Sequence, residues 1–269
     1  MNFELYLRRI KYTGEVCADL PTLRSLLHHH VFNIPFEVFD IHSRTPISLQ
    51  VESIYRKVIL GKRGGYCFEL NILFHRLLQR FGFTVSMVSG RLLHGHGYGP
   101  EFEHLALIVE LEGRKWLVDA GYGDFSLQPL AIQPDEIQSD GRTFYQVTDK
   151  VIVDGEKYLG VVKWNHSKQA FRTEYIFTLI PRVEQEFAGM NHFHQTSPKS
   201  HFARSLICTL PTKDGRITII NNRLIRTEHG KKQVKVILNP EHREELLEKY
   251  FHFDMANASL APAPGYIGG

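Results

Sequence analysis

The spacing of hydrophobic residues changes at Gly82, and this change constrains the fold more than any other feature of the chain. Before Gly82, residues 21–32, 51–60 and 68–81 place apolar side chains three and four positions apart, as amphipathic helices do. After it, short alternating or β-rich runs between turn residues predict strands, so we expect an α+β fold. The predicted strands are 83–90, 103–111, 115–123, 144–153, 157–165, 175–182, 203–210, 216–228 and 233–238, with a helix and a loop over 181–202 and a final helix over 240–251.

The composition favours a folded protein with a large core. The 269 residues are 43% hydrophobic, which is enough to bury such a core without disulfides or metal, and a formal net charge of +3 disfavours both intrinsic disorder and a dedicated nucleic-acid binder. The first twenty residues do not resemble a signal peptide, and no apolar run approaches the roughly 18 residues that span a bilayer. Three cysteines without a CxxC pair argue against a disulfide framework and predict a cytoplasmic protein.

Cys67 lies where the glycine-rich turn RGGY meets the start of the helix predicted over 68–81. Free N–H groups and the helix dipole at such a position favour a negative charge, so a reactive thiolate is expected there. The alternative is a small apolar residue on a buried helix, because free cysteine is among the most buried residue types. Cys67 alone does not decide between the two.

Residues 103–123, EHLALIVELEGRKWLVDAGYG, predict a β-hairpin that turns at Glu112 and Gly113. A two- or four-residue loop there pairs residues whose numbers add to 225, which makes His104 and Asp119 diagonal neighbours on one face of the hairpin. Their backbones would then be about 7 to 8 Å apart, a separation that the side chains bridge. A three-residue loop would place them on opposite faces.

Cys67, His104 and Asp119 together predict a catalytic triad. The carboxylate would hold the imidazole in one tautomer and stabilise its protonated form, while the other ring nitrogen serves the thiol. Each residue alone also fits an ordinary structural role, since the chain has 15 histidines. A cysteine at a glycine-flanked helix start, combined with a His/Asp pair on one face, favours nucleophilic catalysis.

Several motifs resemble those of the arylamine N-acetyltransferases. RGGYCFELN at 63–71, NIPFEVFD at 33–40, QTSPKSHF at 195–202 and the HLALIVEL and WLVDAGYG pair keep the order and approximate spacing of that family. The resemblance implies a Cys-His-Asp core like that of papain and transglutaminase folds. It also implies three domains, namely an N-terminal helical bundle over 1–83, a central β-barrel over 84–190 and a C-terminal α/β lid over 191–254. Residues 255–269 are rich in Ala, Pro and Gly and offer little to pack, so we expect an expression remnant or a mobile tail there.

The resemblance also implies the chemistry. In that family a cysteine takes the acetyl group from acetyl-coenzyme A and passes it to an aromatic amine or a hydrazine, in a ping-pong reaction that uses no metal. The family's nucleophile, histidine and aspartate fall on Cys67, His104 and Asp119. The small-molecule acceptor and acetyl-coenzyme A are therefore the expected partners, with no nucleic acid and no membrane.

Further residues follow from the same resemblance. Gly121, Tyr122 and Gly123 are expected beside the pantetheine arm and thiol of the cofactor. Ser197 falls where some bacterial relatives carry a histidine that meets coenzyme A. Phe36 and Tyr122 are expected to line the acceptor pocket, because a flat aromatic ring suits an aromatic amine. Phe36 fits an ordinary core position equally well.

Two alternative functions remain open on the sequence. One is an amide synthase or thioester hydrolase that uses the same triad with another acyl donor. The other is a non-catalytic protein that binds a polyanion through a basic C-terminal region. The basic region holds nine cations: Lys199, Arg204, Lys213, Arg216, Arg223, Arg226, Lys231, Lys232 and Lys235.

A metal site is not expected, because the histidine groups 28–30 and 94/96 lack the ligand spacing of a zinc site.

Overall fold

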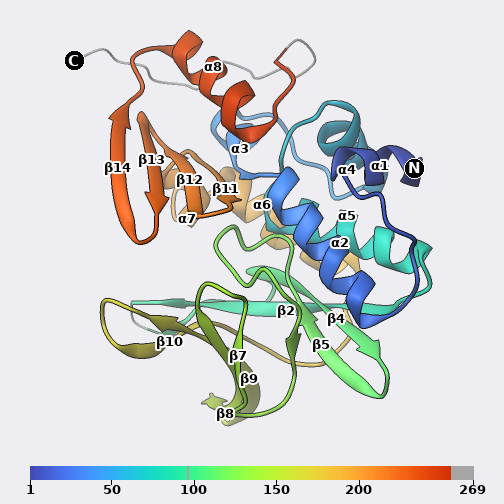
Figure 1. Cartoon of the computed structure of the whole chain (residues 1–269). Coiled ribbons are helices and arrows are strands. Elements are labelled where there is room, and N and C mark those ends of the chain that lie inside the picture. The colour runs from blue at the N-terminus through green and yellow to red at the C-terminus, as the bar shows by residue number, and fades with distance from the viewer. Residues whose placement is uncertain (96, 256–269) are drawn as a thin grey trace.

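The computed structural model describes residues 1–95 and 97–255, and long helices fill the N-terminal part of the chain (Figure 1). Asp19 caps one of them by accepting a hydrogen bond from the Thr22 N–H at 2.8 Å. The helix predicted over 68–81 ends at Arg80, shortly before Gly82, whose φ of +84° suits glycine. The elements of this part are α1 (Phe3–Arg9), α2 (Leu20–Asn33), α3 (Phe39–His42), α4 (Val51–Tyr55), the π-helical turn η1 (Arg56–Leu60) and α5 (Cys67–Arg80).

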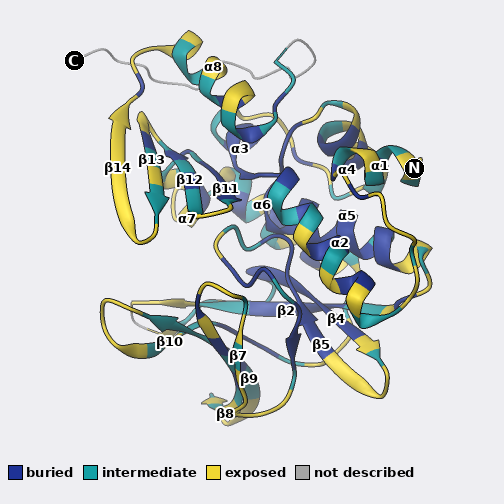
Figure 2. Ribbon diagram, in the orientation of Figure 1, coloured by how far each residue is buried: buried dark blue, intermediate teal, exposed yellow. Residues whose placement is uncertain are grey.

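Helix α5 is buried on almost every side (Figure 2). It contacts α4 as well as strands β2 (Thr84–His94) and β4 (His104–Leu111). Its apolar stripe faces the core as predicted, but the polar side chains of Glu69, Asn71 and His75 are buried too. A helix that is buried all round lies between two layers of structure, and here it lies between the helices and the barrel.

The middle of the chain forms one antiparallel sheet that curls into a nearly closed barrel (Figure 1). Its strand order is β6-β5-β4-β2-β10-β9-β8-β7, with β3 beside β2. Contacts between β6 and β8, together with a bridge between Pro134 and Val147, bring the two ends of the sheet together. The remaining strands are β3 (Gly97–Tyr98), β5 (Arg114–Val118), β6 (Leu130–Ala131), β7 (Ile137–Ser139), β8 (Phe144–Val153), β9 (Glu156–Asn165) and β10 (Ala170–Phe177).

The hairpin of β4 and β5 has the register predicted from the sequence. Leu107 pairs with Val118, so the numbers of paired residues add to 225. The two turn residues, Glu112 and Gly113, have φ of 53° and 73°, as a tight two-residue hairpin turn requires. The start of β4 and the residues after β5 therefore lie side by side next to α5.

A second antiparallel sheet has the order β1-β11-β12-β13-β14. Its edge strand β1 comes from the N-terminal part of the chain, with Phe36 opposite Thr209 and Glu37 opposite Cys208. The single strand predicted over 216–228 is wrong, because a turn at Asn221, with φ of 51°, divides it into two. The elements are β1 (Phe36–Glu37), β11 (Ile207–Thr212), β12 (Gly215–Ile220), β13 (Arg223–Glu228) and β14 (Lys231–Val236), with α8 (Pro240–Phe251) packed against them.

Short helices link the barrel to the second sheet, where a helix and a loop were predicted. They are η2 (Glu184–Phe187), α6 (Ala188–Thr196) and α7 (His201–Arg204). Within residues 1–95 and 97–255, no helix has both the length and the apolar character needed to cross a bilayer. The predicted tail lies outside the described residues except for Met255, as does His96, and the boundaries of the three domains stay a prediction.

Candidate active site

The glycine-rich turn before Cys67 is fixed by its close approach to the start of β1. A side-chain carbon at Gly64 would lie 2.2 Å from the Pro35 carbonyl oxygen, so only glycine fits this position. The Gly65 carbonyl accepts a hydrogen bond from the Glu37 N–H at 2.9 Å. The turn therefore joins the nucleophile's helix to the edge of the second sheet.

Five charged residues that are buried or half-buried surround this turn and pair with one another. They are Glu37, Asp40, Lys57, Arg63 and Glu69. Arg63 Nη2 lies 2.7 Å from Glu37 Oε1 and 2.8 Å from Asp40 Oδ1. Lys57 Nζ lies 2.9 Å from Glu69 Oε2, which also accepts a hydrogen bond from the Tyr66 N–H at the start of α5. Arg63 and Glu69 thus support the start of the helix that carries Cys67.

His104 and Asp119 form the predicted pair in the buried interior. His104 Nε2 lies 2.6 Å from Asp119 Oδ2, and the two residues are only 2% and 3% exposed. This contact uses the Nε2 nitrogen, so Nδ1 remains for chemistry. An imidazole held in this way is fixed in one tautomer and one orientation.

Asp119 accepts three further hydrogen bonds, and two come from side chains that sequence reasoning missed. Asn71 Nδ2 donates to Oδ1 at 2.9 Å, and the Tyr175 hydroxyl donates to Oδ2 at 3.0 Å. The Gly121 N–H donates to Oδ1 at 3.0 Å. Asn71 lies one helical turn after Cys67, a spacing that puts both on one face of α5, and this spacing was the signal that could have identified it.

Asn71 also ties the nucleophile's helix directly to the hairpin. Its Nδ2 donates to the Leu105 carbonyl at 2.6 Å, and its Oδ1 accepts from the Ala120 N–H at 2.9 Å. Both backbone groups belong to residues next to the triad, since they follow His104 and Asp119. One amide side chain therefore sets the position of Cys67 relative to the histidine and the aspartate.

Gly121 allows the end of the hairpin to lie against the first turn of α5. A side-chain carbon there would lie 2.7 Å from the Cys67 carbonyl oxygen and 2.9 Å from the Cys67 Cα. Real atoms do not approach that closely, so any larger residue would push the two elements apart. The glycine predicted to lie beside the cofactor thus also brings the triad together.

The electrostatics of the Cys67 thiol differ from the sequence expectation. Burial raises the pKa of the thiol well above its ordinary value, and the Asp119 carboxylate raises it further. The N–H groups of Phe68 and Cys67 at the helix start lower the pKa, as predicted, but do not outweigh burial. The thiolate therefore requires transfer of the thiol proton to the imidazole, so that an ion pair replaces a lone buried charge.

Cys67 and His104 face a common cavity of about 340 Å³. It lies where α5, the end of the hairpin and the second sheet meet. The residues predicted to touch cofactor or acceptor, Phe36, Gly121, Tyr122 and Gly123, all line it. The cavity therefore brings the expected nucleophile, base and aromatic contacts together.

Comparisons with known proteins agree with this geometry. A family model described as N-acetyltransferase matches residues 19–260. The chain is 30% identical over 275 residues to a pineal gland isozyme of arylamine N-acetyltransferase from Gallus gallus, with 95% of each chain covered. The chain belongs to the arylamine N-acetyltransferase family. It is also 31% identical over 228 residues to the arylamine N-acetyltransferase of Escherichia coli (strain K12), which covers 84% of this chain and 79% of that one.

The fold matches solved structures of this acyltransferase family as well. The structure of Mycobacterium marinum arylamine N-acetyltransferase in complex with CoA superposes with a TM-score of 0.86 at 25% identity. The match covers 96% of this chain and 94% of that one. The α+β fold predicted from the sequence, with helices before a barrel and a Cys-His-Asp core, is confirmed.

Ser197 is not among the residues that line the cavity within the described part of the chain. It ends α6, where its N–H donates to the Phe193 carbonyl at 2.9 Å. His201 and Phe202, a few residues later, form that part of the cavity wall. The same segment therefore reaches the cavity through α7.

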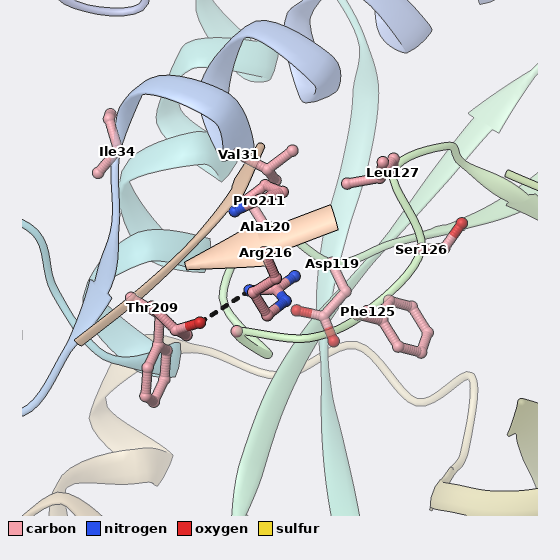
Figure 3. Close-up of a pocket in the computed structure, with 12 residues that line it drawn as sticks. Val31, Ile34, Asp119, Ala120, Phe125, Ser126, Leu127, Thr209, Pro211 and Arg216 are labelled. Carbon is pink, nitrogen blue, oxygen red and sulfur yellow. Dashed lines mark hydrogen bonds between the residues drawn. The ribbon is translucent and has the colours of Figure 1, made fainter. Parts of the chain in front are cut away.

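A second pocket, of about 20 Å³, is drawn in Figure 3 and shares several lining residues with the main cavity. Asp119 and Phe36 line it together with Thr209 and Arg216 of the second sheet. Arg216 Nη1 donates a hydrogen bond to Thr209 Oγ1 at 3.0 Å, drawn as a dashed line in Figure 3. The second sheet thus supplies both polar and charged groups to the wall of this pocket.

No group of three or more His, Cys, Asp or Glu residues suited to a metal ion occurs within the described part of the chain. Cys17 and Cys208 are free, like Cys67. Cys208 is buried in the second sheet, and burial raises the pKa of its thiol well above the ordinary value. Cys67 is therefore the cysteine whose surroundings supply a base.

Proposed function

We propose that the protein transfers an acetyl group from acetyl-coenzyme A to the nitrogen of aromatic amines and hydrazines, through an acetyl group carried on Cys67. The observation that carries this proposal is the shared cavity of Cys67 and His104, with His104 held by Asp119. Membership of the family and the coenzyme A complex of the Mycobacterium marinum relative support acetyl-coenzyme A as the donor.

In the first half-reaction, His104 Nδ1 takes the proton of the Cys67 thiol, and the sulfur attacks the thioester carbonyl. The tetrahedral intermediate collapses with cleavage of the carbonyl–sulfur bond of acetyl-coenzyme A. The departing thiolate takes the proton back from the His104 imidazolium and leaves as coenzyme A. Cys67 then carries the acetyl group as a thioester, and the Cys67 N–H at the helix start is a candidate donor to the oxyanion.

In the second half-reaction, the acceptor nitrogen attacks the acetyl carbonyl on Cys67. His104 takes the proton that the nitrogen loses, and the carbon–sulfur bond breaks. The product is an amide, and the cysteine thiolate and imidazolium together restore the neutral thiol and imidazole. Asp119 remains ionised throughout and stabilises the imidazolium.

We propose that the two substrates occupy separate surfaces of the cavity. Phe36 and Tyr122 offer aromatic faces to the ring of the acceptor. Gly121 and Gly123, which lack side chains, leave room for the pantetheine arm beside Tyr122. Ser197, at the end of α6, stays a proposed contact of coenzyme A further from the reacting atoms.

Initial-rate kinetics test the proposal. With an aromatic amine and acetyl-coenzyme A varied together, we expect double-reciprocal plots with parallel lines, as a ping-pong reaction gives. Intersecting lines would contradict a free acetyl-enzyme. Hydrolysis of the thioester at the same rate with and without amine would instead identify a hydrolase on the same triad.

The cytoplasm is the proposed compartment, because Cys17, Cys67 and Cys208 are all free thiols in the structure. A reducing compartment keeps such thiols from forming mixed disulfides. We further propose that the partners are the two small-molecule substrates, without nucleic acid or membrane. Cell fractionation with an antibody to the chain tests the compartment, and a membrane-bound or exported pool would contradict it.

A further inference from the structure

Lys57 is a largely buried charged residue that the proposed reaction does not use. It belongs to the π-helical turn η1, and its side chain is only 14% exposed. Its Nζ lies 2.8 Å from Asp40 Oδ2, 2.9 Å from Glu69 Oε2 and 3.6 Å from Glu37 Oε1. Burying a charge costs free energy unless an opposite charge pairs with it, so the lysine and these carboxylates depend on one another.

Glu69 links Lys57 to the turn before Cys67. Its Oε2 accepts a hydrogen bond from the Tyr66 N–H at 3.2 Å, and a side-chain carbon at Gly65 would lie 3.2 Å from the same oxygen. The carboxylate therefore lies within the turn that leads into the nucleophile. Lys57 Nζ donates to both of its oxygens, at 3.0 and 2.9 Å, so the lysine fixes the carboxylate in place.

The charge of Glu69 is balanced by Lys57. The other cation of the cluster is Arg63, which pairs with Glu37 and Asp40. The cluster thus holds two cations against three carboxylates. Loss of the lysine charge would leave one cation against three carboxylates, beside the start of α5.

Lys57 therefore acts on the Cys67 thiol through Glu69. Burial is the largest cause that raises the pKa of the thiol, and the carboxylates of Asp119 and Glu69 raise it further. A cation beside Glu69 opposes that effect and favours the charged form of the sulfur. His104 faces the same cavity as the thiol. Within the described part of the chain, the other charged or titratable groups that line this cavity are Tyr122, Asp124, His201 and Arg216.

Building on the proposed acetyl transfer, we propose that Lys57 is a positioning residue for Cys67 and sets the pH range in which the thiol reacts. It does so by holding the Glu69 carboxylate in the turn and by balancing its charge. The thiol proton still passes to His104, and Lys57 takes no part in that transfer. Loss of the lysine charge raises the pH at which Cys67 becomes reactive, and loss of the Glu69 charge lowers it.

The test measures the rate of Cys67 alkylation by iodoacetamide across pH, from the mass of the peptide that contains Cys67. The proteins are the wild type, Lys57→Gln, Glu69→Gln and the double variant. Glutamine at position 69 keeps an oxygen that accepts the Tyr66 N–H. We expect the profile of Lys57→Gln to move up by about one pH unit and that of Glu69→Gln to move down by a similar amount. The two shifts should cancel in the double variant.

Two comparisons keep the result independent of folding. Lys115→Gln is the matched control, because Lys115 pairs with Glu110 at 3.1 Å on the exposed part of the hairpin, and its profile should coincide with that of the wild type. If Lys57→Gln does not fold, Glu69→Gln is compared with the double variant, since these two proteins differ only at position 57. The same upward shift is expected there.

Other outcomes overturn the inference. Slower alkylation at every pH, with unshifted profiles, would mean that Lys57 only supports the fold. An upward shift of the double variant relative to the wild type, as large as that of Lys57→Gln, would mean that Lys57 acts without Glu69. Intact mass of the wild type after mixing with acetyl-coenzyme A separates this failure from that of the proposed function, because only the latter leaves Cys67 without an acetyl group.

Discussion

Asn71 Nδ2 lies 2.9 Å from Asp119 Oδ1, so the helix that carries the nucleophile directly holds the carboxylate that orients the base. Helix α5 carries Cys67, and the hairpin of β4 and β5 carries His104 and positions Asp119. Asn71, which is not a member of the triad, links these two elements. The same amide pairs with the Leu105 carbonyl on β4 and with the Ala120 N–H just after β5. This arrangement makes the geometry of the site depend on Asn71 as well as on Cys67, His104 and Asp119.

Asn71→Ala should lower both activity and stability. The change leaves the Leu105 carbonyl and the Ala120 N–H without their partner in a buried region, which costs about 1–3 kcal/mol of unfolding free energy. The rate of Cys67 alkylation by iodoacetamide should fall as well, because His104 is no longer held in place. Urea unfolding and alkylation rates measure the two effects. Asn222→Ala, in an exposed turn, is the control, and equal effects in both variants would contradict the assigned role.

Tyr175→Phe should slow acetyl transfer by about tenfold while leaving the fold intact. The phenol donates to Asp119 Oδ2, the oxygen that also meets His104, so its loss weakens the orientation of the carboxylate. Tyr145→Phe is a matched control, because Tyr145 is equally buried in the barrel core. Single-turnover acetylation of Cys67 measures the effect. An equal rate for Tyr175→Phe and the wild type would refute the contribution of this hydroxyl.

Gly121→Ala should separate α5 from the hairpin and reduce stability by about 1–3 kcal/mol, the usual cost of overpacking. The added carbon would meet the Cys67 carbonyl oxygen and Cα, so acetylation of Cys67 should fall in parallel. Gly189→Ala is the control, since a side-chain carbon there meets nothing within 4 Å. Urea denaturation and acetylation rates are the readouts. Full activity in Gly121→Ala would show that the two elements do not approach as closely as described.

How far the sequence predicts the site depends on whether the contacts are local. The hairpin register follows from alternation and turn chemistry, so the pairing of His104 with Asp119 is predictable from the sequence of the hairpin alone. The contribution of β1 to the second sheet cannot be predicted from the sequence. Phe36 and Thr209 are distant in the chain, and a two-residue strand has no periodicity. Tyr175 and Arg216 reach the site by tertiary packing alone, and no local pattern marks them.

The raised pKa of the Cys67 thiol could not be predicted from the sequence either. A helix start predicts a stabilised thiolate, and the N–H groups that stabilise it are present. The degree of burial that raises the pKa of Cys67 depends on packing of the barrel and the second sheet around α5. The sequence around Cys67 therefore predicts that the N–H groups lower the pKa of the thiol. Tertiary packing decides whether the net shift of that pKa is up or down.

Stability should fall as the pH falls from about 6.5 towards 4. Burial, the largest cause, lowers the pKa of His30 to about 3 and those of His75 and His194 to about 4, from an ordinary value of 6.5. Between these values the unfolded chain binds more protons than the folded one, so acid favours unfolding. Each of the two shifts to about 4 corresponds to about 3 kcal/mol.

Urea unfolding at several pH values checks this dependence. His75→Gln should flatten the loss of stability between pH 6.5 and 4. The control is His229→Gln, whose side chain is exposed, and it should follow the wild type. Identical slopes for all three proteins would show that burial of His75 does not oppose its protonation.

The central claim is tested most directly by intact-protein mass spectrometry after brief mixing with acetyl-coenzyme A and no acceptor. We predict one added acetyl group on the wild type, none on Cys67→Ala, and release of the group as an amide when an aromatic amine is added. Acetylation of the Cys67→Ala variant to the same extent, or transfer to the amine without any acetylated enzyme, would contradict the account.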